Sequence, residues 1–260
     1  MISQPPRITD ERFNVMMSLF SYDSPQSQNG RSVLCRVLDG RALEDICPVD
    51  QMILTPDERA RYAHLRPLRS KALAYRTRAE LRRMLGREIG LPPQMVPLIT
   101  SAHGKPVCPH PLAAGLAFSV AHAEECAMIA LGEVEGVGVD VEKVIQREPA
   151  EELLTILFSD EEQEQWSDLP PPLRCRAFTE AWTIKEAVLK AIGTGLDGSP
   201  HDVTVTFDHM GRATPVFSDA NWILERVLFC PCYTACLIAV VPERAGAVRE
   251  KKVTAMPTAA

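Results

Sequence analysis

Strict alternation of apolar residues with small or polar ones predicts a β-strand in the segment GVGVDVEKV, from Gly136 to Val144. The valines at 137, 139 and 141 share one face, and Gly138, Asp140 and Glu142 share the other, because strand side chains alternate with period two. The preceding segments LAFSVAHA and CAMIALGEV are separated by short polar turns, which favours antiparallel neighbours. Four later segments are predicted as closing strands: DVTVTF, ATPVF, ILERVLF and CYTACLIAVV.

Helical periodicity predicts two long helices, Leu68 to Gly90 and Cys175 to Ile192. Capping-box patterns begin two shorter helices, at Thr55 with Glu58 and at Ser159 with Glu162. A further helix is expected from Glu148 to Phe158, followed later by a proline-rich loop at Pro170 to Pro172. The first long helix is expected to turn one apolar row inward: Leu73, Thr77, Leu81, Met84, Leu85 and Ile89. The chain is therefore an α+β protein with mainly antiparallel strands.

Composition excludes several classes of function. The 260 residues are 46% hydrophobic and 24% charged, enough for one large domain or two small ones. A net charge of −6 and only 6% aromatic residues argue against a nucleic-acid partner. There is no signal-peptide pattern and no apolar run of membrane-spanning length, and the eight cysteines are typical of reduced thiols, so we expect a cytoplasmic protein without a membrane partner. Residues 1–30 and 244–260 lack apolar periodicity and are expected to be poorly ordered.

Candidate chemistry gathers in two segments. Asp140 and Glu142 point the same way on their strand, so they repel each other unless a cation lies between them, and an oxygen-only site suits magnesium. The alternative is a strand with one wet face, on which both carboxylates meet water. In FTEAWTIKEAVLKAIGTGL, Glu186 and Lys190 are i,i+4 neighbours, which a solvated surface pair would also explain. Lys185 lies along the buried stripe, where its ammonium needs an anion such as phosphate.

These segments together resemble the Sfp-type 4′-phosphopantetheinyl transferases. The strand motif has the family's G-[VI]-D-x-E form, and Trp182 to Leu196 matches W-[ST]-x-K-E-A-x-x-K-x-x-G-x-G-L in full. The segment Gly115 to Leu131 resembles the family's F-S-x-S-H block, and the GKP of residues 104–106 gives a fourth match. The resemblance implies transfer of the phosphopantetheine arm of coenzyme A to a serine of an apo acyl or peptidyl carrier protein, with release of adenosine 3′,5′-bisphosphate.

The resemblance also assigns the reacting groups. It implies that Asp140, Glu142 and Glu186 hold magnesium, or manganese, together with the coenzyme A diphosphate. Glu186 is then the base that accepts the serine proton, and Lys190 stabilises charge on the phosphates.

Residues that bind the coenzyme are implied in the same way. Lys105 and His122 match positions that contact its phosphates, and Lys185 is expected to hold coenzyme or carrier. The basic side of the first long helix, with Arg78 and Arg82, is expected to contact the 3′-phosphate. The chain departs from the family at Ala121, where a serine is common, so one hydroxyl contact to phosphate is missing.

The family further implies two similar α/β-mixed halves related by a pseudo-twofold axis, with the coenzyme between them. We place a coenzyme-binding half at residues 31–134 and a metal-binding, catalytic half at 135–243, in a monomer. Two other readings stay open: a metal-dependent phosphohydrolase acting on coenzyme A or a related diphosphate, and an inactive module that binds coenzyme or carrier.

Overall fold

The computed structural model describes residues 16–22, 31–41, 43–101, 105–193, 198–217 and 221–241, with side chains from residue 33 onward. The N-terminal half contains β1 (Met16–Tyr22), β2 (Arg31–Asp39), α1 (Pro48–Ile53), α2 (Pro56–Tyr62), α3 (Leu68–Ile89), the 3₁₀ turns η1 (Pro93–Met95) and η2 (Pro111–Ala113), and the strands β3 (Ile99–Thr100), β4 (Pro106–Val107), β5 (Ala117–Ala123) and β6 (Cys126–Gly132). The C-terminal half contains β7 (Gly136–Lys143), α4 (Glu151–Leu157), α5 (Asp160–Ser167), α6 (Pro171–Ile192), the 3₁₀ turn η4 (Pro200–Asp202), β8 (Val205–Phe207), β9 (Ala213–Pro215), β10 (Trp222–Arg226) and β11 (Tyr233–Val240).

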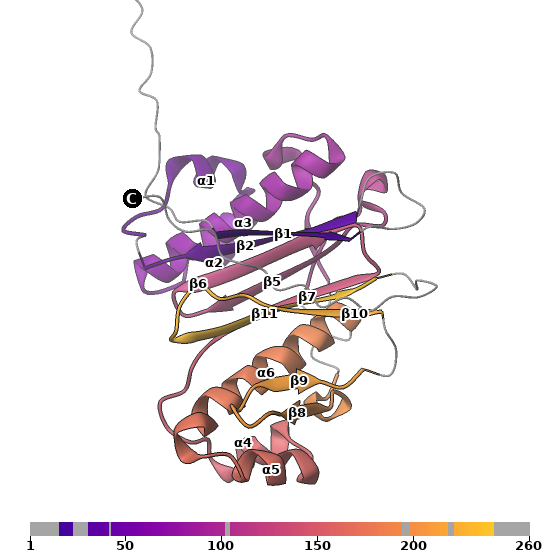
Figure 1. Cartoon of the computed structure of the whole chain (residues 1–260). Coiled ribbons are helices and arrows are strands. Elements are labelled where there is room, and N and C mark those ends of the chain that lie inside the picture. Colours follow the sequence, from indigo (N-terminus) through magenta and orange to yellow (C-terminus); the bar gives the residue numbers. More distant parts are fainter. Residues whose placement is uncertain are drawn as a thin grey trace, which may run out of the picture.

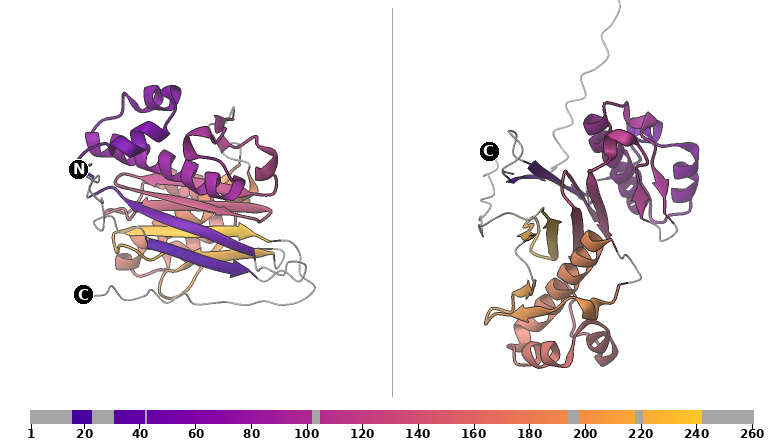
Figure 2. Two further views of the ribbon diagram at one scale, coloured as in Figure 1. Left: turned by 90° about the horizontal axis from the view of Figure 1, so that it is seen from above. Right: turned by 90° about the vertical axis from the view of Figure 1, so that its right-hand side faces the viewer.

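These elements form four layers (Figures 1 and 2). Helices α1–α3 cover one outer side, α4–α6 cover the other, and two antiparallel sheets lie between them. Alternation along the strands produces the layers. On β6, Ala127, Ile129 and Leu131 pack toward α3, whereas Met128 and Ala130 pack toward the second sheet. The predicted α+β class with antiparallel strands is confirmed.

The two halves share one topology. The first sheet has the order β1-β2-β6-β5 and the second has the order β10-β11-β7. Apart from β1, each half runs strand, 22-residue helix, short hairpin, strand, strand, and its last strand lies between the other two. The sequence shows no internal repeat, but the fold repeats, and the boundary drawn before residue 135 falls in the turn between β6 and β7.

Most predicted elements agree with the structure to within a few residues. Both capping boxes are present, with reciprocal bonds between Thr55 and Glu58 and between Ser159 and Glu162. One difference is that α6 begins at Pro171, inside the predicted loop, because proline fits the first turn of a helix.

A second difference lies in the N-terminal segment. Residues 16–22 form β1, which pairs antiparallel with β2, whereas the sequence predicted poor order across residues 1–30. The rest of that segment, and the tail 244–260, lie outside the described residues. Among the helices that the structure describes, none combines the length and apolar character needed to span a bilayer.

Candidate active site

Helix α6 lies directly on β7 because two glycines leave room for its backbone. A Cβ atom added at Gly138 would lie 1.8 Å from the carbonyl oxygen of Ala187, and one added at Gly136 would lie 2.3 Å from that of Ala191. Atoms cannot approach so closely, so only glycine allows this contact. The strand face that carries the carboxylates is therefore covered by the motif helix.

This arrangement brings Asp140 and Glu142 on β7 into electrostatic contact with Glu186 and Lys190 on α6. Asp140 is 4% exposed, and its Oδ1 accepts a hydrogen bond of 2.6 Å from Lys190 Nζ. Glu142 and Glu186 are half-buried. The wet-face alternative for β7 is wrong, because α6 covers that face. The solvated i,i+4 pair is wrong as well, since Lys190 binds Asp140 on the neighbouring strand.

The site is short of positive charge. Burial raises the pKa of Asp140 from 3.8 to about 6, against the opposing effect of Lys190. Burial and then the charge of Asp140 raise the pKa of Glu142 from 4.5 to about 7. The Oδ2 atom of Asp140 is buried and has no hydrogen-bond partner. An unpaired buried carboxylate oxygen is costly, so the cluster favours a cation.

The donor set suits a hard cation although the carboxylates do not yet close around one. Among the residues that the structure describes, no three His, Cys, Asp or Glu side chains are close enough to hold a metal ion as they stand. Lys190 occupies one oxygen of Asp140 and leaves the other free. Oxygen ligands alone fit magnesium. The chemistry of the donor atoms, though not the present spacing of the three carboxylates, is therefore the kind that magnesium prefers.

Two residues of the N-terminal half, His122 and Lys105, lie close to Lys190. Strand β5 lies beside β7, and the backbone N–H of Val139 donates to Ser119 Oγ at 3.2 Å across the junction. His122 lies near the end of β5, and its side chain remains exposed. Surrounding protein lowers the pKa of His122, with the charge of Lys190 as the second cause, so the imidazole is neutral at pH 7 without an anion. Lys105 Nζ donates to the backbone oxygen of Lys190 at 3.3 Å.

Lys185 does not join this cluster. Its side chain is fully buried on another face of α6, where Nζ donates to Glu162 Oε2 at 2.7 Å and to the carbonyl oxygens of Leu157 and Pro200. The anion that the sequence demanded is the capping glutamate of α5 rather than a phosphate.

Arg82 repeats this arrangement in the other half. It is 1% exposed and binds Glu58, the capping glutamate of α2, as well as the carbonyl oxygens of Pro93 and Val96. Arg78 is also buried and paired with Glu58. The predicted basic ridge on α3 is therefore turned inward at these two positions, where both guanidiniums are paired with Glu58.

Ala121 is 3% exposed and packs in the layer between the two sheets. The neighbouring His122 points to the other face of β5, as strand alternation requires. A hydroxyl at position 121 would therefore face the core between the sheets. Gly104, Gly195 and Leu196, which completed two of the sequence motifs, lie outside the described residues.

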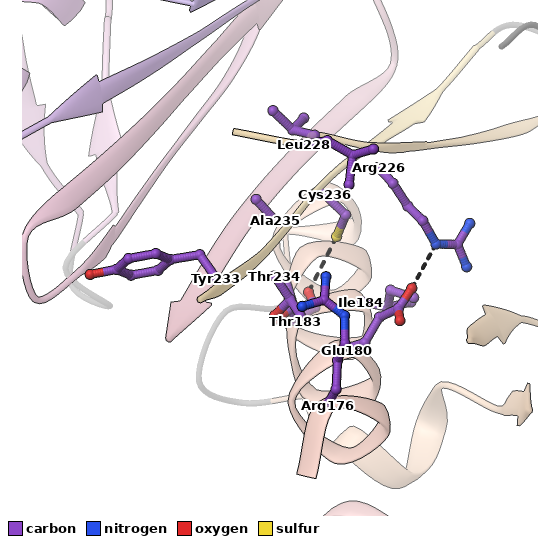
Figure 3. Close-up of a pocket in the computed structure, with 11 residues that line it drawn as sticks. Arg176, Glu180, Thr183, Ile184, Arg226, Leu228, Tyr233, Thr234, Ala235 and Cys236 are labelled. Atoms are coloured by element: carbon purple, nitrogen blue, oxygen red, sulfur yellow. Dashed lines mark hydrogen bonds and ion pairs between the residues drawn. The ribbon is translucent and has the colours of Figure 1, made fainter. Parts of the chain in front are cut away.

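The sequence did not indicate a pair of hydroxyl groups beside the carboxylates. Thr234 on β11 lies directly opposite Glu142, and its Oγ1 is 2.6 Å from that of Thr183 on α6. Both threonines line a hollow between α6 and the β10–β11 region, shown in Figure 3. Arg226 binds Glu180 there at 2.6 Å. The spacing of Thr183, one helical turn before Glu186, was the available signal.

Comparison with known proteins identifies the motif region. Residues 136–232 match the model of the 4′-phosphopantetheinyl transferase superfamily. This part of the chain belongs to that superfamily. It spans β7 and α6 and so includes all three carboxylates and Lys190.

Named members of the superfamily are similar over more of the chain. The 4′-phosphopantetheinyl transferase HetI of Nostoc is 28% identical over 75% of this chain and 75% of its own length. The putative 4′-phosphopantetheinyl transferase slr0495 of Synechocystis is 28% identical over 61% of this chain and 67% of its own length. A solved structure, Thermotoga maritima holo-[acyl-carrier-protein] synthase, gives a TM-score of 0.34 at 22% identity, covering 42% of this chain and 65% of that one.

Proposed function

We propose that this protein is a magnesium-dependent 4′-phosphopantetheinyl transferase that moves the phosphopantetheine arm of coenzyme A to a serine of an apo acyl or peptidyl carrier protein. The observation that carries the proposal is the buried, unpaired Oδ2 of Asp140, which lies beside two further carboxylates and Lys190. The superfamily match over residues 136–232 makes phosphopantetheinyl transfer the best-supported use of such a site.

Glu186 is proposed as the general base. A serine hydroxyl is a weak nucleophile at neutral pH, so a carboxylate must accept its proton as the oxygen attacks the β-phosphate of coenzyme A. Asp140 is buried and already paired with Lys190, whereas Glu186 is only half-buried. Glu186 can therefore meet an incoming side chain from a second protein.

Lys190 is proposed to serve two partners. In this structure its ammonium neutralises Asp140, and its side chain is still 28% exposed. If a cation took the place of Lys190 at Asp140, Lys190 would be free to donate to the coenzyme diphosphate as charge develops there. Magnesium held by Asp140, Glu142 and Glu186 would spread the negative charge of that diphosphate.

Coenzyme phosphates are proposed to bind between the halves, at His122 and Lys105. A neutral imidazole becomes a cation when an anion binds beside it, because the anion raises its pKa. Lys185, Arg78 and Arg82 are left out of this site because each is buried and bound to a glutamate. Since both halves belong to one chain, we propose that a monomer holds the whole site.

The test is intact-protein mass spectrometry of an apo carrier protein after incubation with this protein, magnesium and coenzyme A. We expect a mass gain of one phosphopantetheine arm that disappears with EDTA. Cleavage of coenzyme A without any carrier protein would instead identify a phosphohydrolase. Coenzyme binding without cleavage or transfer, across acyl and peptidyl carriers, would identify an inactive binding module.

A matched pair of variants tests the base. Glu186→Gln keeps the shape of the side chain but cannot accept a proton, whereas Glu180→Gln makes the same change earlier on α6, at a residue paired with Arg226. We expect coenzyme A binding by calorimetry in both variants and transfer only in the second. Transfer by Glu186→Gln at the wild-type rate would reject the assignment.

A further inference from the structure

The turn between β10 and β11 holds two cysteines whose sulfur atoms touch. Cys230 and Cys232 flank Pro231, and the backbone N–H of Tyr233 donates to the carbonyl oxygen of Cys230 at 3.1 Å, which closes a β-turn. The two Sγ atoms are 2.7 Å apart. Proline at the second position of the turn restricts its backbone, which favours the turn that brings the two thiols together.

Arg41 supplies positive charge to one of these thiols. Its Nη1 atom lies 3.7 Å from Cys230 Sγ, and its guanidinium is held by Asp39 at the end of β2. The hydrogen bond from Cys232 lowers the pKa of Cys230, and Arg41 lowers it further. Cys230 is half-buried and Cys232 is exposed, so reagents from solvent reach the pair.

The other described cysteines lack this combination. Cys35, Cys126 and Cys236 are buried, and burial raises the pKa of the first two to about 12. Cys47, Cys108 and Cys175 are partly exposed. Within the described ranges, the pair at 230 and 232 is the one place where two cysteine sulfurs are in hydrogen-bond contact. Among the residues that the structure describes, none stands beside them as a third metal ligand.

The turn is fixed on both sides but takes no part in the proposed transfer. Arg176 on α6 donates to the carbonyl oxygen of Pro231 at 2.9 Å, and the backbone N–H of Val144 donates to that of Cys232 at 2.8 Å. Arg176, Leu228 and Tyr233 line the hollow next to this turn, and Figure 3 shows the Tyr233 ring directed away from the other side chains. These contacts hold the backbone of the turn, and the sulfur atoms bind none of the three carboxylates.

We propose that Cys230 and Cys232 form a reversible dithiol–disulfide site that reacts with small disulfides such as glutathione disulfide. The Cys230 thiolate attacks one sulfur of the reagent, forms a mixed disulfide and releases one thiolate. Cys232 then loses its proton and attacks the Cys230 sulfur, which closes the intramolecular disulfide and releases the second thiol. The protein loses two protons and two electrons, and one glutathione disulfide becomes two glutathione molecules.

The experiment uses the full chain in glutathione buffers of increasing oxidised fraction. Samples are quenched with acid, the remaining thiols are alkylated, and the products are located by intact-mass and peptide mass spectrometry. We expect the loss of two hydrogens, with the peptide that contains Cys230 and Cys232 protected from alkylation and restored by reductant. A wild-type protein that keeps glutathione on either cysteine, or that links one of them to Cys126, would overturn the proposal.

Variants separate the two thiols. Cys230→Ser and Cys232→Ser should each stop at a mixed disulfide on the remaining cysteine, because no neighbour resolves it. Cys175→Ser, at a partly exposed thiol on α6, should oxidise like the wild type. Arg41→Gln should slow the first step, because losing the guanidinium raises the pKa of Cys230 and the fall in the thiolate fraction outweighs the gain in its nucleophilicity. An unchanged rate in Arg41→Gln would contradict the role given to Arg41.

Discussion

Replacing Asp140 with asparagine tests whether the site is short of positive charge. Burial raises the pKa of this carboxyl from 3.8 to about 6 in the folded protein, so the folded state keeps its proton to higher pH than the unfolded state. The stability that this creates is present below pH 4 and is lost as pH rises through 6. Between pH 5 and pH 7.5 the free energy of unfolding should fall by roughly 1.4 kcal/mol through the titration of Asp140 alone, at about 1.36 kcal/mol for each unit of pKa.

The assay is urea denaturation of wild type and Asp140→Asn in EDTA at both pH values. Asparagine has no charge to bury. As pH rises from 5 to 7.5, the free energy of unfolding of the variant should therefore fall by about 1.4 kcal/mol less than that of the wild type. Glu142, whose pKa is raised to about 7, adds an effect of the same sign in the wild type. Comparing the two proteins cancels titrations elsewhere in the chain.

Magnesium supplies the second half of this test. A cation at the carboxylates should stabilise the wild type by up to about 2.7 kcal/mol at one hundred times its dissociation constant, because it binds only the folded state. The same addition should do little for Asp140→Asn at pH 7.5. If the two proteins lose stability in parallel between pH 5 and pH 7.5, and magnesium acts equally on both, Asp140 is not a charge waiting for a cation.

Three further substitutions probe the proton transfer, the helix contact and the buried lysine. Glu186→Gln should lower the transfer rate by about 10²–10⁴-fold with coenzyme A affinity retained, measured by carrier mass spectrometry and calorimetry. Gly138→Ala should cost about 1–3 kcal/mol or more in urea denaturation, because the added methyl meets the backbone of α6, whereas Gly90→Ala, which meets no atom within 4 Å, should cost only the roughly 1 kcal/mol of its left-handed conformation. Lys185→Met should lower the free energy of unfolding by about 3–5 kcal/mol, since it leaves Glu162 buried without its cation, and a stability equal to wild type would contradict the structural role of the lysine.

The sequence predicted well which carboxylates share a strand face and which helical residues are neighbours, because the evidence for both is local. Period-two alternation placed Asp140 and Glu142 on one face of a strand, and helical spacing placed Glu186 one turn from Lys190. The alternation did not indicate that Gly138 is the point where the backbone of α6 approaches the strand. The local pattern did not show which element covers this face of the strand. Whether that face meets water or a helix depends on α6 returning to β7 about forty residues later, which periodicity does not report.

The buried cations show where such reasoning fails. Helical spacing placed Lys185 on an apolar stripe and required an anion for it, but any anion would satisfy that requirement. The structure supplies Glu162, whose carboxylate already caps α5 and whose second oxygen accepts from the backbone N–H of Val205 at 2.7 Å. A capping glutamate was predicted correctly, yet its second role depends on how two helices pack.

Each half contains a buried cation paired with a capping glutamate, so neither Arg82 nor Lys185 needs a phosphate as its anion. Arg82 and Lys185 are each the fifteenth residue of a 22-residue helix, and each binds the capping glutamate of a preceding short helix. Since the arrangement recurs where only one half carries the carboxylate cluster, it belongs to the folding of each half rather than to the chemistry. The groups that differ between the halves are Asp140, Glu142, Glu186 and Lys190, which is why the proposed transfer is assigned to them and not to Arg82 or Lys185.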